Sequence, residues 1–130
     1  MKLIATLAMA LTLSGCAAIQ SWIPSFWDDN QSAKIIDLRQ SIEQISCEPG
    51  QQLGSAQRVV GDLQWFQLYS ESKGTLQQDV LRIIKPMQET AGDWLTRTQT
   101  KEGSKSYCEL KKRTLRLQAG RAAEAILGRF

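Results

Sequence analysis

The chain has 130 residues, of which 42% are hydrophobic and 22% are charged, and its formal net charge is +3 at pH 7. It contains no histidine, which excludes an imidazole general base and any metal site with histidine ligands. This length fits one domain with a modest hydrophobic core.

The first 15 residues have the pattern of a secretory signal peptide. Lys2 supplies a positive start, and the apolar run from Leu3 to Leu13 is interrupted only by two threonines. This run is shorter than the roughly 20 apolar residues that a membrane-spanning helix needs, and it has the usual length of a signal peptide's hydrophobic region. We therefore expect residues 1–15 to be removed on export.

The apolar run ends in the sequence Leu13-Ser14-Gly15-Cys16. This motif resembles the lipobox of bacterial lipoproteins, in which a small residue and Gly precede an obligatory Cys. The resemblance implies that Cys16 becomes the new N-terminus and carries two or three acyl chains, enough for stable anchoring. The next residue is Ala17 and not Asp, which in Gram-negative lipoproteins resembles the pattern sent to the outer membrane. We expect an outer-membrane lipoprotein that faces the periplasm.

Residues 16–30 are predicted to form a short lipidated leader. It contains four large apolar side chains, Trp22, Ile23, Phe26 and Trp27. Tryptophan favours the headgroup level of a membrane, so these residues are candidates for a membrane-interface contact. Folding back onto the domain as a cap is an equally good interpretation, and the sequence leaves both open.

Residues 31–130 are predicted to form one domain that opens with two amphipathic helices. The first begins near Asn30 or Ser32, which are good N-caps, and ends at Glu48-Pro49-Gly50. The second runs from about residue 51 to residue 70. Along both helices apolar residues recur at spacings of three and four, which indicates one buried face on each. The predicted buried residues are Ile35, Leu38, Ile42, Ile45, Leu53, Ala56, Val59, Val60, Leu63, Trp65 and Phe66.

The third helix is predicted to open at Thr75, which forms a capping-box pattern with Gln78. Pro86 lies inside the helical pattern, so a kink or a break is expected near Ile84. Residues 96–103 are polar and are expected to form a loop or a fraying end. The predicted buried residues are Leu76, Val80, Ile83, Ile84, Met87, Ala91, Trp94 and Leu95.

The fourth helix is predicted to open at Ser106 with a second capping box and to continue to about Leu127. Its buried stripe is Cys108, Leu115, Ala119, Ala122 and Ile126, with Leu110, Leu117 and Ala123 beside it. No alternating pattern of convincing length suggests a strand. The fold class is therefore predicted to be all-α.

Cys47 and Cys108 remain once Cys16 is assigned to the lipid. In an oxidising compartment an even pair favours a disulfide, with two free buried thiols as the alternative. In an antiparallel four-helix bundle the end of the first helix and the start of the fourth lie at the same pole. The predicted Cys47–Cys108 bridge therefore agrees with a small antiparallel bundle stapled by one disulfide.

Charge is unevenly distributed along the chain. Residues 17–104 contain 8 Lys and Arg against 11 Asp and Glu, whereas residues 105–130 contain 7 against 2. The basic fourth helix could contact an acidic protein or an anionic glycan, although a solvated helix face is the simpler interpretation. Nucleic acid is not expected as a partner of an exported protein. The candidate partner-binding residues are Lys111, Lys112, Arg113, Arg116 and Arg121.

Catalytic and cofactor motifs are not apparent in the sequence. With Cys16 acylated and the other two cysteines paired, no thiol nucleophile or cysteine zinc site remains. The glycines do not match phosphate-loop or dinucleotide spacing. The pair Asp28-Asp29 fits the positive end of a helix dipole better than a hydrolase or cation site. We expect no enzyme activity, no cofactor and no metal site.

The sequence favours a non-enzymatic, lipid-anchored envelope protein that acts as a binding or structural module for an envelope protein partner. One alternative is an outer-membrane spanin subunit of a phage lysis system, which this chain resembles only in size and lipobox. Another is a surface-exclusion or inhibitor lipoprotein. The identity of the partner and the oligomeric state stay open at this point.

Overall fold

The computed structural model describes residues 28–128, except for the side chain of Leu76. The helices are α3 (Asp29–Glu43), α4 (Gln52–Ser72), α5 (Gln78–Thr100) and α6 (Lys105–Leu127), and a 3-10 turn, η1 (Gly74–Gln77), joins α4 to α5. Residues 28–128 contain no strand. The prediction of a small all-α bundle of four helices is confirmed.

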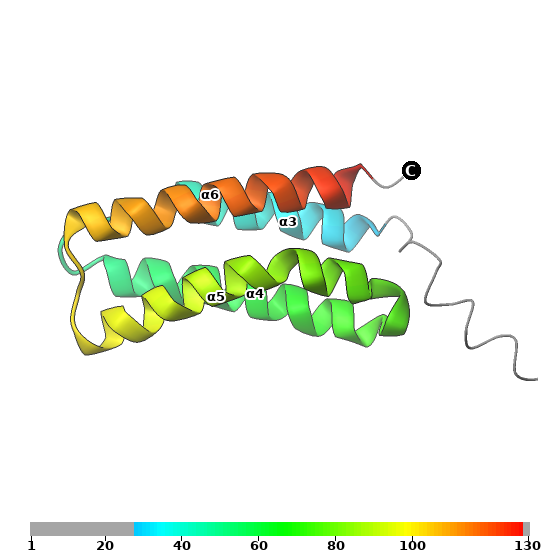
Figure 1. The fold of residues 1–130 in the computed structure, drawn as a ribbon, viewed down its shortest axis with the longest axis horizontal. Helices are drawn as coiled ribbons and strands as arrows, with labels where there is room; N and C mark the ends of the chain where they lie inside the picture. Colours follow the sequence, from blue (N-terminus) through cyan, green and yellow to red (C-terminus); the bar gives the residue numbers. More distant parts are fainter. Residues whose placement is uncertain (1–27, 129–130) are drawn as a thin grey trace, which may run out of the picture.

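The four helices form a ring of neighbours in which α3 packs on α4, α4 on α5, α5 on α6 and α6 on α3. Successive helices run in opposite directions, so the start of α3, the η1 turn and the end of α6 lie at one end of the bundle (Figure 1). We call this end the N-terminal pole. The other end, the disulfide pole, carries the α3–α4 and α5–α6 connections.

A disulfide joins Cys47, in the α3–α4 connection, to Cys108, in the first turn of α6, with a Cα–Cα distance of 5.6 Å. Both cysteines are buried. The predicted bridge is therefore confirmed. Because it closes a loop that contains α4 and α5, it ties the first and last helices together at the disulfide pole.

Each helix buries one apolar stripe, as the spacing of three and four predicts. The largest buried side chains are Trp94 and Phe66. Four side chains expected on or beside these stripes lie mostly outside the core, because a helix at the corner of a bundle covers only part of its circumference. They are Leu53 at 37% exposure, Trp65 at 44%, Leu110 at 52% and Leu117 at 68%.

The first helix begins earlier than expected, because Asp28 and neither Asn30 nor Ser32 is its N-cap. The Asp28 carboxylate accepts a hydrogen bond of 3.0 Å from the backbone N–H of Gln31. The same carboxylate accepts from the hydroxyl of Tyr69 on α4 at 3.2 Å. Residues 29 and 30, which the sequence division assigned to the leader, therefore belong to the first helix.

Replacing Asp28 with Ala is expected to lower the free energy of unfolding by about 1–2 kcal/mol, the upper range for loss of an N-cap, since a contact to Tyr69 is lost as well. Chemical denaturation followed by circular dichroism measures the change. Asp37, exposed in the middle of α3, is the matched control, and Asp37→Ala is expected to change stability by less than about 0.5 kcal/mol. Equal losses in the two variants would contradict the capping role.

The first helix also ends earlier than expected. Its last residue is Glu43, so the Glu48-Pro49-Gly50 segment lies beyond the helix and not at its end. The connection turns at Gly50, whose φ of 79° favours glycine. Ile45 and Cys47 lie beyond the end of the helix. Their side chains are nevertheless buried in the core.

The capping box expected at the start of α5 is wrong, and of the kink or break expected near Ile84 the break does not occur. The capping box at Thr75 does not form, because residues 74–77 make the η1 turn and α5 begins at Gln78 without a side-chain cap. Pro86 does not break the helix, which continues through Ile84 to Thr100. Pro86 and Arg82, the residue four positions before it, are both exposed, so water can satisfy the carbonyl that loses its partner.

The segment 96–103 is helical as far as Thr100, and not a loop throughout. Thr98 is buried beside the α5 stripe, and its hydroxyl donates to the carbonyl of Trp94 at 2.7 Å. The N-cap of the next helix, α6, lies two residues before the expected cap, because Ser104 and not Ser106 accepts from the backbone N–H of Tyr107 at 3.2 Å. The polar residues 96–100 therefore form one more turn of α5, which their composition did not predict.

The signal peptide expected over residues 1–15, the lipidation expected at Cys16 and the apolar leader residues all lie outside the described residues. Those leader residues are Trp22, Ile23, Phe26 and Trp27. Within residues 28–128, no helix combines the length and the apolar character needed to cross a membrane.

Candidate partner-binding face

The basic residues of α6 divide into two groups according to their contacts. Four of the six are held by other parts of the bundle. Lys105 pairs with Glu48 at 2.7 Å, and Lys112 donates to the carbonyl of Ile45 at 2.9 Å. These two contacts fasten the first half of α6 to the α3–α4 connection.

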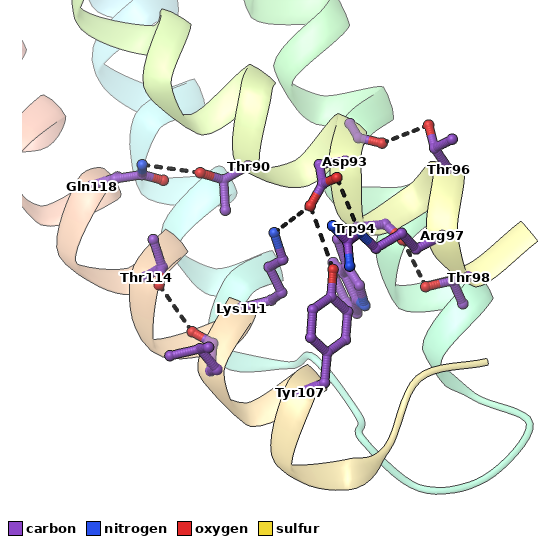
Figure 2. Close-up of polar contacts among 12 residues, drawn as sticks. Thr90, Asp93, Trp94, Thr96, Arg97, Thr98, Tyr107, Lys111, Thr114 and Gln118 are labelled. Atoms are coloured by element: carbon purple, nitrogen blue, oxygen red, sulfur yellow. Dashed lines mark hydrogen bonds and ion pairs between the residues drawn. The ribbon is translucent and has the colours of Figure 1, made fainter. Parts of the chain in front are cut away.

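Lys111 belongs to a polar cluster between α5 and α6, centred on Asp93 (Figure 2). The carboxylate of Asp93 lies 2.6 Å from the Lys111 amine and 3.2 Å from Nε of Arg97, and accepts from the hydroxyl of Tyr107 at 3.4 Å. The hydrogen bonds from Lys111 and then from Arg97 lower the pKa of Asp93 below its ordinary value. A carboxylate held this way accepts a proton poorly, so the cluster suits a structural role.

Arg116 reaches across to α3, where its guanidinium makes two parallel hydrogen bonds to the carboxylate of Glu43. This bond geometry matches the planar fork of arginine. The hydrogen bond from Arg116 is the main cause that lowers the pKa of Glu43 below its ordinary value. Arg116, an expected partner-binding residue, is thus engaged by its own chain.

Arg113 and Arg121 are exposed, and neither makes a hydrogen bond or an ion pair within residues 28–128. They are the two remaining basic residues of α6. Of the five candidate residues from the sequence, three are therefore occupied and two are available. The structure narrows the candidate surface to the part of α6 that carries these two arginines.

Two exposed leucines lie on the same side of α6, Leu110 at 52% exposure and Leu117 at 68%. At 3.6 residues per turn, Leu110 and Leu117 point in directions about 20° apart, while Arg113 and Arg121 lie about 40° to either side of Leu117. We call these four residues the α6 ridge. The ridge is a short apolar line with a guanidinium on each flank, and the exposed carboxylate of Glu124 follows in the same line seven residues after Leu117.

Leu110 and Leu117 were expected beside the buried stripe, but at 3.6 residues per turn they lie on the side of α6 opposite Cys108, Leu115 and Ala119, which accounts for their exposure. The signal that could have found them is their position seven residues apart in line with two arginines. That pattern is amphipathic in its own right.

A second polar cluster joins α3 to α4, and sequence reasoning missed it. The rings of Trp65 and Tyr69 stack with centroids 5.0 Å apart, and Lys34 and Lys73 lie over their outer faces at 5.3 and 4.9 Å. Tyr69 also donates to Asp28, and Tyr69 is the main cause that raises the pKa of Lys73. Through Lys34 and Asp28 this stack on α4 is tied to the first helix, while Trp65 stays 44% exposed.

Shallow grooves run along two sides of the bundle. One lies between α3 and α6 near the N-terminal pole, with a volume of about 430 Å³, and its charged lining residues are Arg39 and Glu124. Another lies between α4 and α5, where the charged lining residues are Glu71, Arg82 and Lys85. Neither groove has an excess of acidic residues.

Within residues 28–128, no group of three or more Cys, Asp or Glu side chains is placed to hold a metal ion. Asp28, which the sequence assigned to the start of a helix, acts as the α3 N-cap. Comparison of the chain with models of protein families, with curated proteins and with solved structures finds no match in any of the three.

Proposed function

We propose that this protein is a non-enzymatic lipoprotein of the bacterial envelope that binds a partner protein through the α6 ridge. The observation that carries the proposal is the division of charge on α6. Four basic side chains are engaged within the chain, whereas Arg113 and Arg121 are exposed beside two exposed leucines. Arginine is enriched at protein interfaces, and exposed leucines beside it add apolar surface that a partner could bury.

The lipobox motif at Cys16 supports the anchored part of the proposal, since acylation there would hold the domain at a membrane surface. Residues 17–27 connect the anchor to the bundle and span at most about 40 Å when fully extended. Helix α6 is about 35 Å long. A tether of this length keeps the α6 ridge close to the membrane while leaving it free to meet a partner.

Site-specific photo-crosslinking in the native host tests the binding function. We would place the photoreactive residue at position 117 of the full chain, with Arg58 on α4 as the control position. The expected result is one dominant protein adduct from position 117 and none from the control. Adducts of equal yield from both positions, or no protein adduct from position 117, would refute the proposed function.

Lipidation is tested separately on the same chain. A Cys16→Ser variant is expected to lose incorporation of an alkyne-labelled fatty acid and to leave the membrane fraction. Incorporation that continues in this variant would contradict anchoring at Cys16. The result does not depend on whether a partner is found.

A further inference from the structure

We infer that the partner of the α6 ridge presents an apolar groove with acidic residues on both rims, so that α6 docks as a helix in a groove. The inference rests on the proposed function and adds the chemistry of the partner. In this binding mode an apolar line on one helix enters a hydrophobic groove, and flanking charges fix orientation and register.

The geometry of the ridge sets the chemistry of the groove. Leu110 and Leu117 lie about 10 Å apart along the helix, so they would fill two successive positions on the floor of the groove. Arg113 and Arg121 lie on opposite flanks of this line and about 12 Å apart along the helix axis. Each rim of the groove would therefore need one acidic residue to pair with the arginine on its side. A planar guanidinium binds a carboxylate through two parallel hydrogen bonds, as Arg116 does with Glu43 within this chain.

Two grooves on this chain lack the acidic rims that the ridge needs. The groove between α3 and α6 has one basic and one acidic lining residue, Arg39 and Glu124. In the α4–α5 groove, the two basic residues Arg82 and Lys85 outnumber Glu71. Docking of Arg113 and Arg121 against either groove would bring arginine near other cations, which opposes association. The charges of these two grooves therefore favour a different protein as the partner.

A lipid surface fits the ridge less well than a protein groove. Helices that lie on membranes have a broad apolar face, and aromatic side chains favour the interface. The ridge has only two leucines in a narrow line, and Tyr107, the aromatic residue of α6, is turned toward Asp93. Both observations favour a narrow protein groove.

The test compares three variants of the full chain that carry the photoreactive residue at position 117. One reverses the flanking charges (Arg113→Glu with Arg121→Glu), and one replaces the apolar line (Leu110→Ser). The matched control reverses the exposed residues Arg58 and Arg82 on α4 and α5, which gives the same change in net charge. Circular dichroism and disulfide content show that each variant is folded.

The charge reversal at the ridge is expected to lower the yield of the protein adduct more than tenfold, and Leu110→Ser several-fold, with less than a twofold effect in the control. The adduct formed by the chain with the photoreactive residue at position 117 and no other substitution is expected to decrease when salt is raised from 50 to 300 mM. Mass spectrometry should map it to a partner segment with Asp or Glu on both sides of apolar residues. Changing these acidic residues to Lys should restore binding to the reversed ridge.

Several outcomes would overturn the inference. A protein adduct that withstands charge reversal and salt, or that maps to a segment without carboxylates, leaves the binding function intact and refutes the acidic groove. An adduct with a second copy of the chain also refutes it. An adduct with lipid alone, together with binding to vesicles that contain phosphatidylglycerol and not to phosphatidylcholine vesicles, refutes the protein partner and the proposed function together.

Discussion

Removal of the disulfide by Cys47→Ala with Cys108→Ala is expected to lower the free energy of unfolding by about 4 kcal/mol. The bridge closes a loop with a sequence separation of 61 residues, and in the chain-entropy model a loop of this length restricts the unfolded chain by about that amount. For a domain of this size the melting temperature should fall on the order of 20 °C. Denaturation under non-reducing conditions measures both quantities.

Reduction of the unmodified protein supplies the control for this variant. Both forms lack the cross-link, so their melting temperatures should agree to within a few degrees. A double variant as stable as the oxidised protein would contradict the expected restriction of the unfolded chain by the bridge.

Trp94→Ala is expected to lower the free energy of unfolding by about 3–5 kcal/mol, the range for deletion of a buried aromatic side chain. Trp94 is fully buried on α5, at 0% exposure, and its loss leaves a cavity that neighbouring helices cannot fill without moving. Chemical denaturation of the purified variant measures the loss. Leu68→Ala, at a position with 57% exposure on α4, is the control and should cost less than about 1 kcal/mol.

The same position offers a second comparison. The indole N–H of Trp94 has no hydrogen-bond acceptor among the described residues. Trp94→Phe keeps most of the ring and removes this unsatisfied donor, so it is expected to cost much less than Trp94→Ala. Equal destabilisation of Trp94→Phe and Trp94→Ala would contradict the description of the indole N–H as an unsatisfied donor.

The core of this fold could be predicted from the sequence because it depends on a local period. Residues such as Ile35, Leu38 and Ile42 are spaced by three and four, and all three are buried. The same spacing predicted Leu115, Ala119 and Ala122 in α6 correctly. Because periodicity requires only neighbours along one helix, it needs no knowledge of how the helices pack.

Helix ends were predicted less well, because several residues near each end can act as caps and tertiary contacts choose between them. Asp28 caps α3 while it also contacts Tyr69 on another helix. Pro86 is tolerated in α5 because its side of the helix faces solvent. Local helix propensity predicts neither the contact of Asp28 with α4 nor the side of α5 that faces solvent.

By itself, the sequence determined the fold class, the buried stripes and the Cys47–Cys108 bridge, since each depends on residue type and spacing along the chain. Only the tertiary structure decided which basic residues of α6 are available. Arg116 meets Glu43 and Lys111 meets Asp93 because packing places α3 and α5 on either side of α6. Arg113 and Arg121 point away from both neighbouring helices, so the position of α6 at a corner of the bundle makes the candidate binding surface.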